Sequence, residues 1–507
     1  MTSPTAVPDT ASDKLDRGVL KIAGVVVLAA IMSILDITVV SVALPTFQRE
    51  FHASYATVAW TMTAYTLALA TVIPLSGWAA DRFGTKRLYL ISIALFVLGS
   101  TLCSVAPGIG ALIAFRVLQG LGGGMLMPVG MTILTRAAGP ERVGRVMALL
   151  GVPMLLGPIF GPILGGWLIQ AASWHWIFLI NVPIGLVGLA FSLRVLPKDR
   201  PQPGESFDFL GMVLLSPGLA LFLYGMSSIP SAGTVAATTV LVPGVIGLLL
   251  VAGFVAHALR TPRPLLDLRL FANRNFTAAV ITMMLFVIAF MGSMLLFPSY
   301  FLQVRGETTL NAGLLIAPQG LGAMLMMPIA GKLTDRSGPG KLTLIGIVLI
   351  VLGMVVFTQI TADTSYVLLL SALFVCGLGL GLVMMPVMSA ALATLADHQI
   401  ARGSTMANIV QQTFGSVGTA VMSVLLTGQV LADPAATAYS AVTQGSLPAS
   451  QVSAAVLAQG RSSLAHGFAF TYTVATVIVA LCLVSGFFLP RKGLDARGEQ
   501  GVPAAGS

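Results

Sequence analysis

Fourteen apolar runs, each close to the roughly 20 residues that a helix needs to cross a bilayer, follow one another along this 507-residue sequence. Charged residues make up only 9% of the chain, against about a quarter in soluble domains, so there is too little charge to cover a water-soluble globule. This pattern excludes a soluble enzyme, a secreted disulfide scaffold and a disordered protein. We expect membrane helices near residues 22–44, 58–80, 88–106, 111–134, 146–171, 177–196, 209–229, 235–258, 276–300, 312–333, 342–361, 366–392, 403–426 and 467–489.

The distribution of basic residues predicts how the chain crosses the membrane. Twenty-three of the 27 Lys and Arg residues lie in the two tails or in every second turn between the runs. Arg49, Arg305 and Arg461 lie in the other turns, and Arg116 lies inside a run. Basic residues gather on the cytoplasmic side, so we expect both termini in the cytoplasm and a multi-pass protein of the cytoplasmic (inner) membrane. The net charge of +9 thus follows from topology and requires no nucleic-acid partner.

Two parts of the sequence repeat each other. Residues 77–87 read GWAADRFGTKR, and residues 331–341 read GKLTDRSGPGK at the equivalent turn. The triplet 127–129 likewise matches 385–387, both reading MPV. Runs 1–6 and 9–14 are therefore predicted to be two copies of one unit, with runs 7 and 8 inserted between them. Two six-helix halves around a cavity at the membrane midplane are typical of transporters.

The repeat divides the chain into expected segments. A cytoplasmic leader covers residues 1–21, the first half covers 22–200, and two inserted helices with their linker cover 201–270. The second half covers 271–490, and a cytoplasmic tail covers 491–507. Within the second half, residues 427–466 are rich in Ala, Ser, Thr and Gln, and we expect an outside loop that is flexible or partly helical.

Several motifs carry a specific resemblance. Residues 77–87 resemble the signature loop of the major facilitator superfamily, and residues 35–45 (LDITVVSVALP) resemble the first-span signature of its fourteen-span drug:proton antiporter branch. That branch usually has Asn where Ser41 stands, and Arg where His175 stands. The resemblance implies an all-α major facilitator fold with fourteen transmembrane helices, and it is uninformative about the cargo. Further motifs of the branch are matched by residues 116–120 (RVLQG), 157–166 (GPIFGPILGG), 174–185 (WHWIFLINVPIG) and 207–211 (FDFLG).

Asp36 is the only carboxylate deep inside a predicted span, where a charge costs roughly 3 kcal/mol. Arg116 lies at a matching depth in the fourth run, about 12 Å from the outer boundary at 1.5 Å per residue. We expect the two to form an ion pair or to share a polar pocket. The pair could be a purely structural lock between helices. It could also couple to protons, because burial disfavours a charged carboxylate and a nearby guanidinium favours it. In the resembled family the span-4 Arg is tied to proton coupling, and Arg116 matches that position.

Two further motifs concern conformational change. In the family the signature loop latches the two halves, whereas the simpler alternative is a basic turn that only fixes topology. Glycines that recur every four residues in 157–166 line one helix face and permit close packing, and in the family this segment is a leak-proof hinge. The expected gating residues are Gly77, Asp81, Arg82, Gly84, Lys86, Arg87, Asp335 and Arg336. The expected hinge residues are Gly157, Pro158, Gly161, Pro162, Gly165 and Gly166.

Candidate cargo contacts are polar residues within the runs and methionines of the second half. Methionine surfaces adapt to varied apolar ligands, although most methionines here are ordinary core or lipid-facing residues. The residues expected to line a substrate cavity are Tyr65, Gln119, Asn181, Gln303, Gln411, Gln412, Met291 and Met294.

No motif indicates cofactor chemistry. The sequence contains no GxxxxGK[ST] and no HExxH, its five histidines are dispersed, and its three cysteines lie far apart. We therefore expect no metal, no cofactor, no ATP and no enzymatic activity. The sequence predicts a monomeric, proton-driven exporter of amphipathic or hydrophobic small molecules. Two alternatives stay open: an exporter of an endogenous lipid, siderophore or metabolite with the same mechanism, and a polytopic membrane enzyme or receptor.

Overall fold

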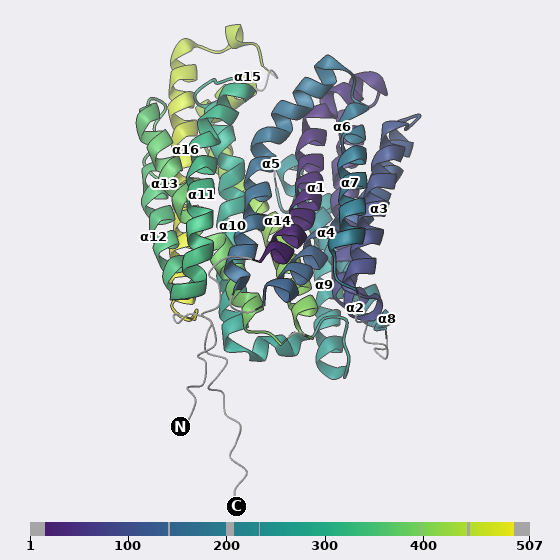
Figure 1. Cartoon of the computed structure of the whole chain (residues 1–507). Coiled ribbons are helices and arrows are strands. Elements are labelled where there is room, and N and C mark those ends of the chain that lie inside the picture. The colour runs from purple at the N-terminus through teal and green to yellow at the C-terminus, as the bar shows by residue number, and fades with distance from the viewer. Residues whose placement is uncertain are drawn as a thin grey trace, which may run out of the picture.

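The computed structural model describes residues 16–139, 142–198, 207–232, 234–396, 398–443 and 447–490. Within these ranges the chain forms helices joined by short turns, and no strand is present. The helices run side by side in one bundle, with the early helices (purple and blue) on one side and the late helices (green and yellow) on the other (Figure 1). The predicted all-α fold is confirmed.

Thirteen helices in the described part of the chain are long and apolar enough to cross a membrane. The remaining predicted run, 146–171, falls on α5 (Val143–Ala171), several of whose side chains lie outside the described set. The thirteen are α1 (Arg17–Glu50), α2 (Tyr55–Phe83), α3 (Thr85–Ser104), α4 (Ile109–Ala138), the consecutive α6 (Trp176–Leu179) and α7 (Asn181–Val195), α8 (Phe209–Ala232), α9 (Thr238–Arg260), α10 (Arg274–Gln303), α11 (Thr309–Ser337), α12 (Pro339–Phe357), α13 (Tyr366–Ala393), α14 (Ile400–Ala432) and α16 (Ala454–Gly486).

Helix packing follows the predicted repeat. In the first half α4 packs against α2 and α3, and α1 packs against α5. In the second half α13 packs against α11 and α12, and α10 packs against α14, which is the same arrangement in repeat-equivalent helices. Across the two halves α5 contacts α11, and the equivalent pair α14 and α2 is also in contact. The two halves are thus related in packing as well as in sequence.

The repeated turns have the same backbone geometry. Gly84 ends α2 with φ 89° and ψ 148°, and Gly338 ends α11 with φ 79° and ψ 148°. Both residues lie in the left-handed half of backbone space, which glycine enters without the penalty that a Cβ atom would bring. Glycine at these two turns allows the chain to reverse at once into α3 and α12.

We call the end of the bundle at which α1 begins and α16 ends the N/C face. Several polar contacts join the two halves toward this face. Ser76 of α2 and Thr405 of α14 share a hydrogen bond of 2.9 Å, and the Ser404 hydroxyl donates to the Pro128 carbonyl of α4 at 2.8 Å. A Cβ at Gly331 of α11 would lie 2.8 Å from Ala148 of α5, so these backbones pass each other closely. The halves are therefore packed together at the N/C face.

The segment 427–466, expected as an outside loop, is mostly helical in its described part. α14 continues to Ala432, α15 spans Pro434–Thr443, a short 3₁₀ turn spans Ala449–Gln451, and α16 begins at Ala454. α15 packs against α16 because Gly460 brings the α16 backbone within reach of the Ala435 carbonyl. In Figure 1 this segment stands at the top of the molecule, opposite the N/C face.

Candidate functional site: a buried ion pair beside a central cavity

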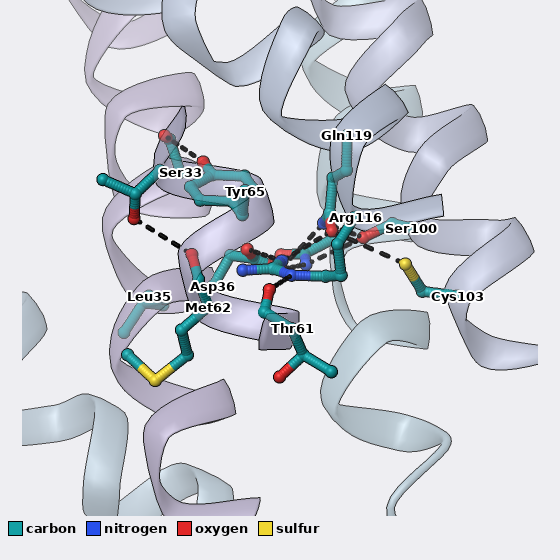
Figure 2. A network of polar contacts seen from close by, with 12 residues as sticks. Ser33, Leu35, Asp36, Thr61, Met62, Tyr65, Ser100, Cys103, Arg116 and Gln119 are labelled. Atoms are coloured by element: carbon teal, nitrogen blue, oxygen red, sulfur yellow. Dashed lines mark hydrogen bonds and ion pairs between the residues drawn. The ribbon is translucent and has the colours of Figure 1, made fainter. Parts of the chain in front are cut away.

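Asp36 of α1 and Arg116 of α4 form an ion pair inside the first half. Arg116 Nη1 donates to Asp36 Oδ2 at 2.5 Å, and the two residues are 0% and 1% exposed. The guanidinium also donates from Nε to the Thr61 carbonyl of α2 at 2.9 Å (Figure 2). Its Cζ atom lies over the Tyr65 ring, 4.1 Å from the ring centre. The predicted pair is present, and it connects three helices.

Two buried amides complete the network around the carboxylate. Gln119 Nε2 donates to Asp36 Oδ1 at 2.8 Å, and Asn181 Nδ2 donates to the same oxygen at 3.1 Å. Gln119 Oε1 accepts from Arg116 Nη1 at 2.6 Å, and both amides donate to the Ser100 hydroxyl of α3, at 2.7 and 3.0 Å. The Asp36 carboxylate thus has three hydrogen-bonding partners, and the network around it involves five helices of the first half, α1, α2, α3, α4 and α7.

The energetics of this network make it sensitive to protonation. Removing one partner of a buried ion pair leaves an uncompensated charge and costs about 3–5 kcal/mol. A proton on Asp36 would neutralise its charge and leave Arg116 in a dry environment with neutral acceptors only. The pair can therefore exchange a proton only if the helices around it rearrange or admit water.

A cavity of ≈ 470 Å³ lies between the two halves. Cavities of about 300–1,000 Å³ suit drug-sized ligands. The described lining carries no charged side chain and combines aliphatic, methionine, hydroxyl and amide groups. The lining residues are Ser33, Ile34, Ile37, Leu69, Ile73, Gly123, Gly124, Met127, Pro128, Met226, Ser227, Met291, Asn408, Gln411, Gln412, Gly415, Ser416 and Thr419.

Ser33 and Tyr65 join the cavity to the ion pair. Ser33 lines the cavity and shares a hydrogen bond of 3.3 Å with the hydroxyl of Tyr65, whose ring covers Arg116 (Figure 2). Gly123, another cavity residue, leaves room for this hydroxyl, because a Cβ there would lie 2.6 Å from it. The charged network is thus one side chain away from the space that a cargo would occupy.

The structure separates the eight predicted cavity residues into three groups. Met291, Gln411 and Gln412 line the cavity. Tyr65, Gln119 and Asn181 belong to the buried network instead, where their polar groups face Asp36, Arg116 or Ser33. Gln303 is the last residue of α10, and Met294 is 38% exposed on that helix, so neither is part of the described lining.

Several network and cavity residues did not come from the sequence analysis. Ser100 and Ser33 are single hydroxyls within apolar helices, and Thr61 contributes only its backbone carbonyl. Gln119 was expected in the cavity, yet its place in the network had a signal, because it follows Arg116 by three residues and therefore lies on the same helix face. No comparable pattern marks the serines.

The predicted gating loop lies at the N/C face. Asp81, 6% exposed, accepts from Arg136 Nη2 of α4 at 3.2 Å and lies 4.0 Å from Arg402 Nε of α14 in the other half. Lys86 donates to the carbonyls of Leu193 and Leu196 at the end of α7, both at 2.8 Å. A Cβ at Gly77 would lie 3.0 Å from Thr405 Oγ1 of α14.

The other predicted gating residues lie on or beside the two repeated turns. Gly84 forms the turn, and Arg82 is exposed. Arg87 follows Lys86 near the start of α3. The side chains of Asp335 and Arg336 in the second copy lie outside the described residues. Both copies approach the opposite half through their first glycine, Gly77 against Thr405 of α14 and Gly331 against Ala148 of α5. In the first copy Asp81 adds its contact with Arg402.

The glycine motif of α5 packs against α1. A Cβ at Gly157 would lie 2.2 Å from Ile34 Cγ2, and a Cβ at Gly165 would lie 3.1 Å from Val39 Cγ1. Gly161 makes the closest approach of the three, against Thr38. Gly166 has nothing within 4 Å, and the side chains of Pro158 and Pro162 lie outside the described residues. The motif thus presses α5 onto the helix that carries Asp36 and lines the cavity.

Residues 26–419 match the family described as Major Facilitator Superfamily. The Multidrug resistance protein B homolog of Mycobacterium tuberculosis (strain H37Rv) is 51% identical over 502 residues, covering 96% of this chain and 92% of that protein. The Multidrug export protein EmrB of Haemophilus influenzae is 32% identical over 397 residues, covering 78% of each chain.

Solved structures share the fold. The human organic anion transporter MFSD10 superimposes with a TM-score of 0.61 at 14% sequence identity, covering 92% of this chain and 100% of that one. The proton:xylose symporter XylE gives a TM-score of 0.57, also at 14% identity, covering 94% and 98%. The sequence match, the paired six-helix halves and the cavity between them agree: this chain belongs to the Major Facilitator Superfamily.

Proposed function

We propose that this protein is a proton-coupled antiporter that exports amphipathic or hydrophobic small molecules by alternating access. One observation carries the proposal. A buried carboxylate–guanidinium pair lies beside an uncharged, drug-sized cavity, and Ser33 and Tyr65 link the two. The printed names of relatives at 51% and 32% identity, a multidrug resistance protein homolog and a multidrug export protein, support the same function.

The cavity favours cargo with a broad apolar surface. Its aliphatic and methionine groups can bury such a surface, and Asn408, Gln411 and Gln412 offer hydrogen bonds to one polar end. No described lining residue carries a charge, so the cavity has no feature that selects strongly for a doubly charged cargo. This chemistry describes a set of molecules rather than one compound.

Orientation follows from the charge distribution. Basic residues concentrate at the N/C face, so we assign this face to the cytoplasmic side of the membrane. The membrane is the cytoplasmic (inner) membrane, across which the proton gradient is directed inward. The two halves meet at that face, through contacts such as Ser76–Thr405, and the cavity lies beyond these contacts. The arrangement corresponds to the state in which cytoplasmic access is closed.

Coupling would then run as follows. A proton entering from outside neutralises Asp36, weakens its bond to Arg116 and favours the return to the cytoplasm-facing state. Cargo entering from the cytoplasm contacts Ser33, displaces Tyr65 from its place over Arg116 and favours release of the proton. The gradient supplies the energy, so the cycle uses no cofactor, and one chain contains every part named here.

Transport in inverted membrane vesicles tests this function. A panel of amphipathic dyes, lipids and metabolites is offered with a proton gradient, with and without an uncoupler, to the wild type and Asp36→Asn. We expect uncoupler-sensitive uptake of amphipathic dyes by the wild type and none by the variant. Asp363→Asn is the matched control, because its side chain is 85% exposed at the opposite face. Undiminished uncoupler-sensitive uptake by Asp36→Asn would remove this residue from coupling.

A further inference from the structure

The inserted helix α8 lies across the seam between the two halves. It packs against α2 of the first half and α14 of the second. Tyr224 of α8 stacks on Trp60 of α2 with ring centres 5.6 Å apart, and Ile229 of α8 shares a hydrophobic cluster with Ala420 of α14. Because it contacts both halves, α8 is not a peripheral addition to one of them.

The repeat shows that this side of the molecule is built differently from the other. The seam between α5 and α11 is repeat-equivalent to the seam between α14 and α2. The first is in direct contact toward the N/C face, where Gly331 of α11 approaches Gly144 and Ala148, and again where Gly151 of α5 faces Met327 of α11. The second has direct contacts toward the N/C face, at Gly77 and Thr405, and α8 covers it farther from that face.

The same helix reaches the cavity. Met226 and Ser227 of α8 belong to its lining, together with Leu69 and Ile73 of α2 and Thr419 of α14. The Ser227 hydroxyl donates to the Tyr224 carbonyl of its own helix at 3.0 Å, so its hydrogen is engaged while its oxygen can still accept a bond. Met226 presents a flexible thioether that adapts to apolar surfaces of different shape.

The partner helix α9 holds α8 in this position from the lipid side. A Cβ at Gly225 of α8 would lie 2.9 Å from Gly244 N of α9, and a Cβ at Gly247 of α9 would lie 2.4 Å from Phe222 N of α8. The two backbones are therefore in close contact. Leu249 of α9 is 66% exposed, and most of the residues in the apolar part of α9 are not buried. α9 therefore supports α8 and faces lipid itself.

A polar clasp closes the hairpin at the N/C face. Asp208, which precedes α8, accepts from Gly211 N at 2.8 Å and from Leu265 N at 2.9 Å, and it bonds to His257 Nε2 of α9 at 2.8 Å. Burial disfavours its charged form, but these hydrogen bonds outweigh burial and lower the pKa of Asp208. The hairpin is thus tied together at its end and along its length.

We propose that α8 is a cargo-contacting wall of the transporter and that Met226 and Ser227 help to determine which molecules the cavity accepts. This inference rests on the proposed export function. The ligands it concerns are amphipathic molecules large enough to reach from the amides of α14 to α8. Residues on the lipid side of the same hairpin should not affect selection.

Substitution in both directions at Met226 tests the proposal by transport. Ethidium and the bulkier doxorubicin are the probes, and the ratio of their export rates is the readout. Met226→Trp should lower the doxorubicin-to-ethidium ratio by roughly tenfold, and Met226→Ala should raise it, because pocket volume discriminates between ligands. Leu249→Trp, on the lipid face of α9, is the matched control and should leave the ratio unchanged. A ratio that stays constant in both Met226 variants overturns the proposal.

Chemical labelling tests the same wall without transport. Met226→Cys should react with a water-soluble maleimide, and ethidium should slow the reaction, whereas Leu249→Cys should not react because it faces lipid. The three native cysteines are buried, and labelling of the wild type measures their background reaction. Equal labelling of both variants with no protection by ethidium would contradict the inference. Failure of the wild type to export either dye, with labelling and protection intact, would instead count against the export function alone.

Discussion

At the scale of single residues, the site depends on how Arg116 is held. Its guanidinium uses Nη1 for Asp36 and Gln119, Nε for the Thr61 carbonyl, and its plane for the Tyr65 ring. A lysine ammonium is a point charge without a planar fork, so it cannot satisfy these partners together.

Arg116→Lys should therefore abolish proton-dependent transport in protein that still reaches the membrane. Arg305→Lys is a demanding control, because Arg305 also donates to backbone carbonyls, of Ala362 and Thr364, and covers the Tyr366 ring at 4.3 Å. We expect Arg305→Lys to retain proton-dependent transport once the rate is corrected for the amount of folded protein in the membrane. Proton-driven transport at wild-type level in Arg116→Lys would leave only a structural role for the pair.

The Tyr65 hydroxyl makes a second residue-scale prediction. Tyr65→Phe keeps the ring over Arg116 and removes the hydrogen bond to Ser33. We expect dye binding to persist while dye-induced proton release falls, with a changed pH profile of transport. Tyr89→Phe is the control, because Tyr89 is buried in α3 and its hydroxyl has no hydrogen-bond partner in the described structure. Normal proton release with an unchanged pH profile in Tyr65→Phe would break the proposed link.

The ion pair could be predicted because depth is a simple function of residue number in a helix. The amides could not be assigned in the same way. Gln119 and Asn181 were expected in the cavity, yet they face Asp36, because the rotation of each helix about its axis decides the direction of a side chain. Ser33 and Ser100 resemble any other serine in an apolar run, and only packing shows that they face polar groups.

At the scale of elements, the turn after α2 connects local structure to conformational change. Asp81 bonds to Arg136 of its own half and lies 4.0 Å from Arg402 of the other half. The contact with Arg402 exists only while the halves are packed together at the N/C face, so it favours that state over the alternative.

Asp81→Ala should shift the balance toward the state that is open at the N/C face. Distance distributions between spin labels at the N/C ends of the two halves measure the shift, and a change of about 1.4 kcal/mol would alter the ratio of states about tenfold. Asp335→Ala, in the repeat-equivalent turn, is the comparison, and we expect a smaller effect. Wild-type distances and transport rate in Asp81→Ala would mean that the turn only fixes topology.

The elements themselves were largely predictable. Thirteen apolar runs coincide with spanning helices, because hydropathy and length determine such helices directly. The segment 427–466 was less clear, since its small and polar residues look like a loop, yet α15 packs on α16 through Gly460. The place of α8 at the seam could not be read from sequence, because it depends on contacts with two distant helices.

At the scale of the whole molecule, the two halves have different tasks. The first half contains the buried ion pair, with Asp36 on α1, Arg116 on α4 and neutral partners on α2, α3 and α7. In the second half, α10 and α14 supply amides, hydroxyls and Met291 to the cavity. The halves meet at the N/C face and around the cavity, so a change in the charged half can be transmitted to the cargo surface through α1. One face of that helix contains Asp36, and on another face Ser33, Ile34 and Ile37 line the cavity.

Proton release on cargo binding tests this account most directly. Purified protein in weakly buffered detergent solution receives ethidium while pH and dye fluorescence are recorded together. The wild type should release protons as it binds dye, and Asp36→Asn should bind dye and release none. If Asp36→Asn binds ethidium and releases as many protons as the wild type, the buried pair does not couple protons to cargo, and the central claim is contradicted.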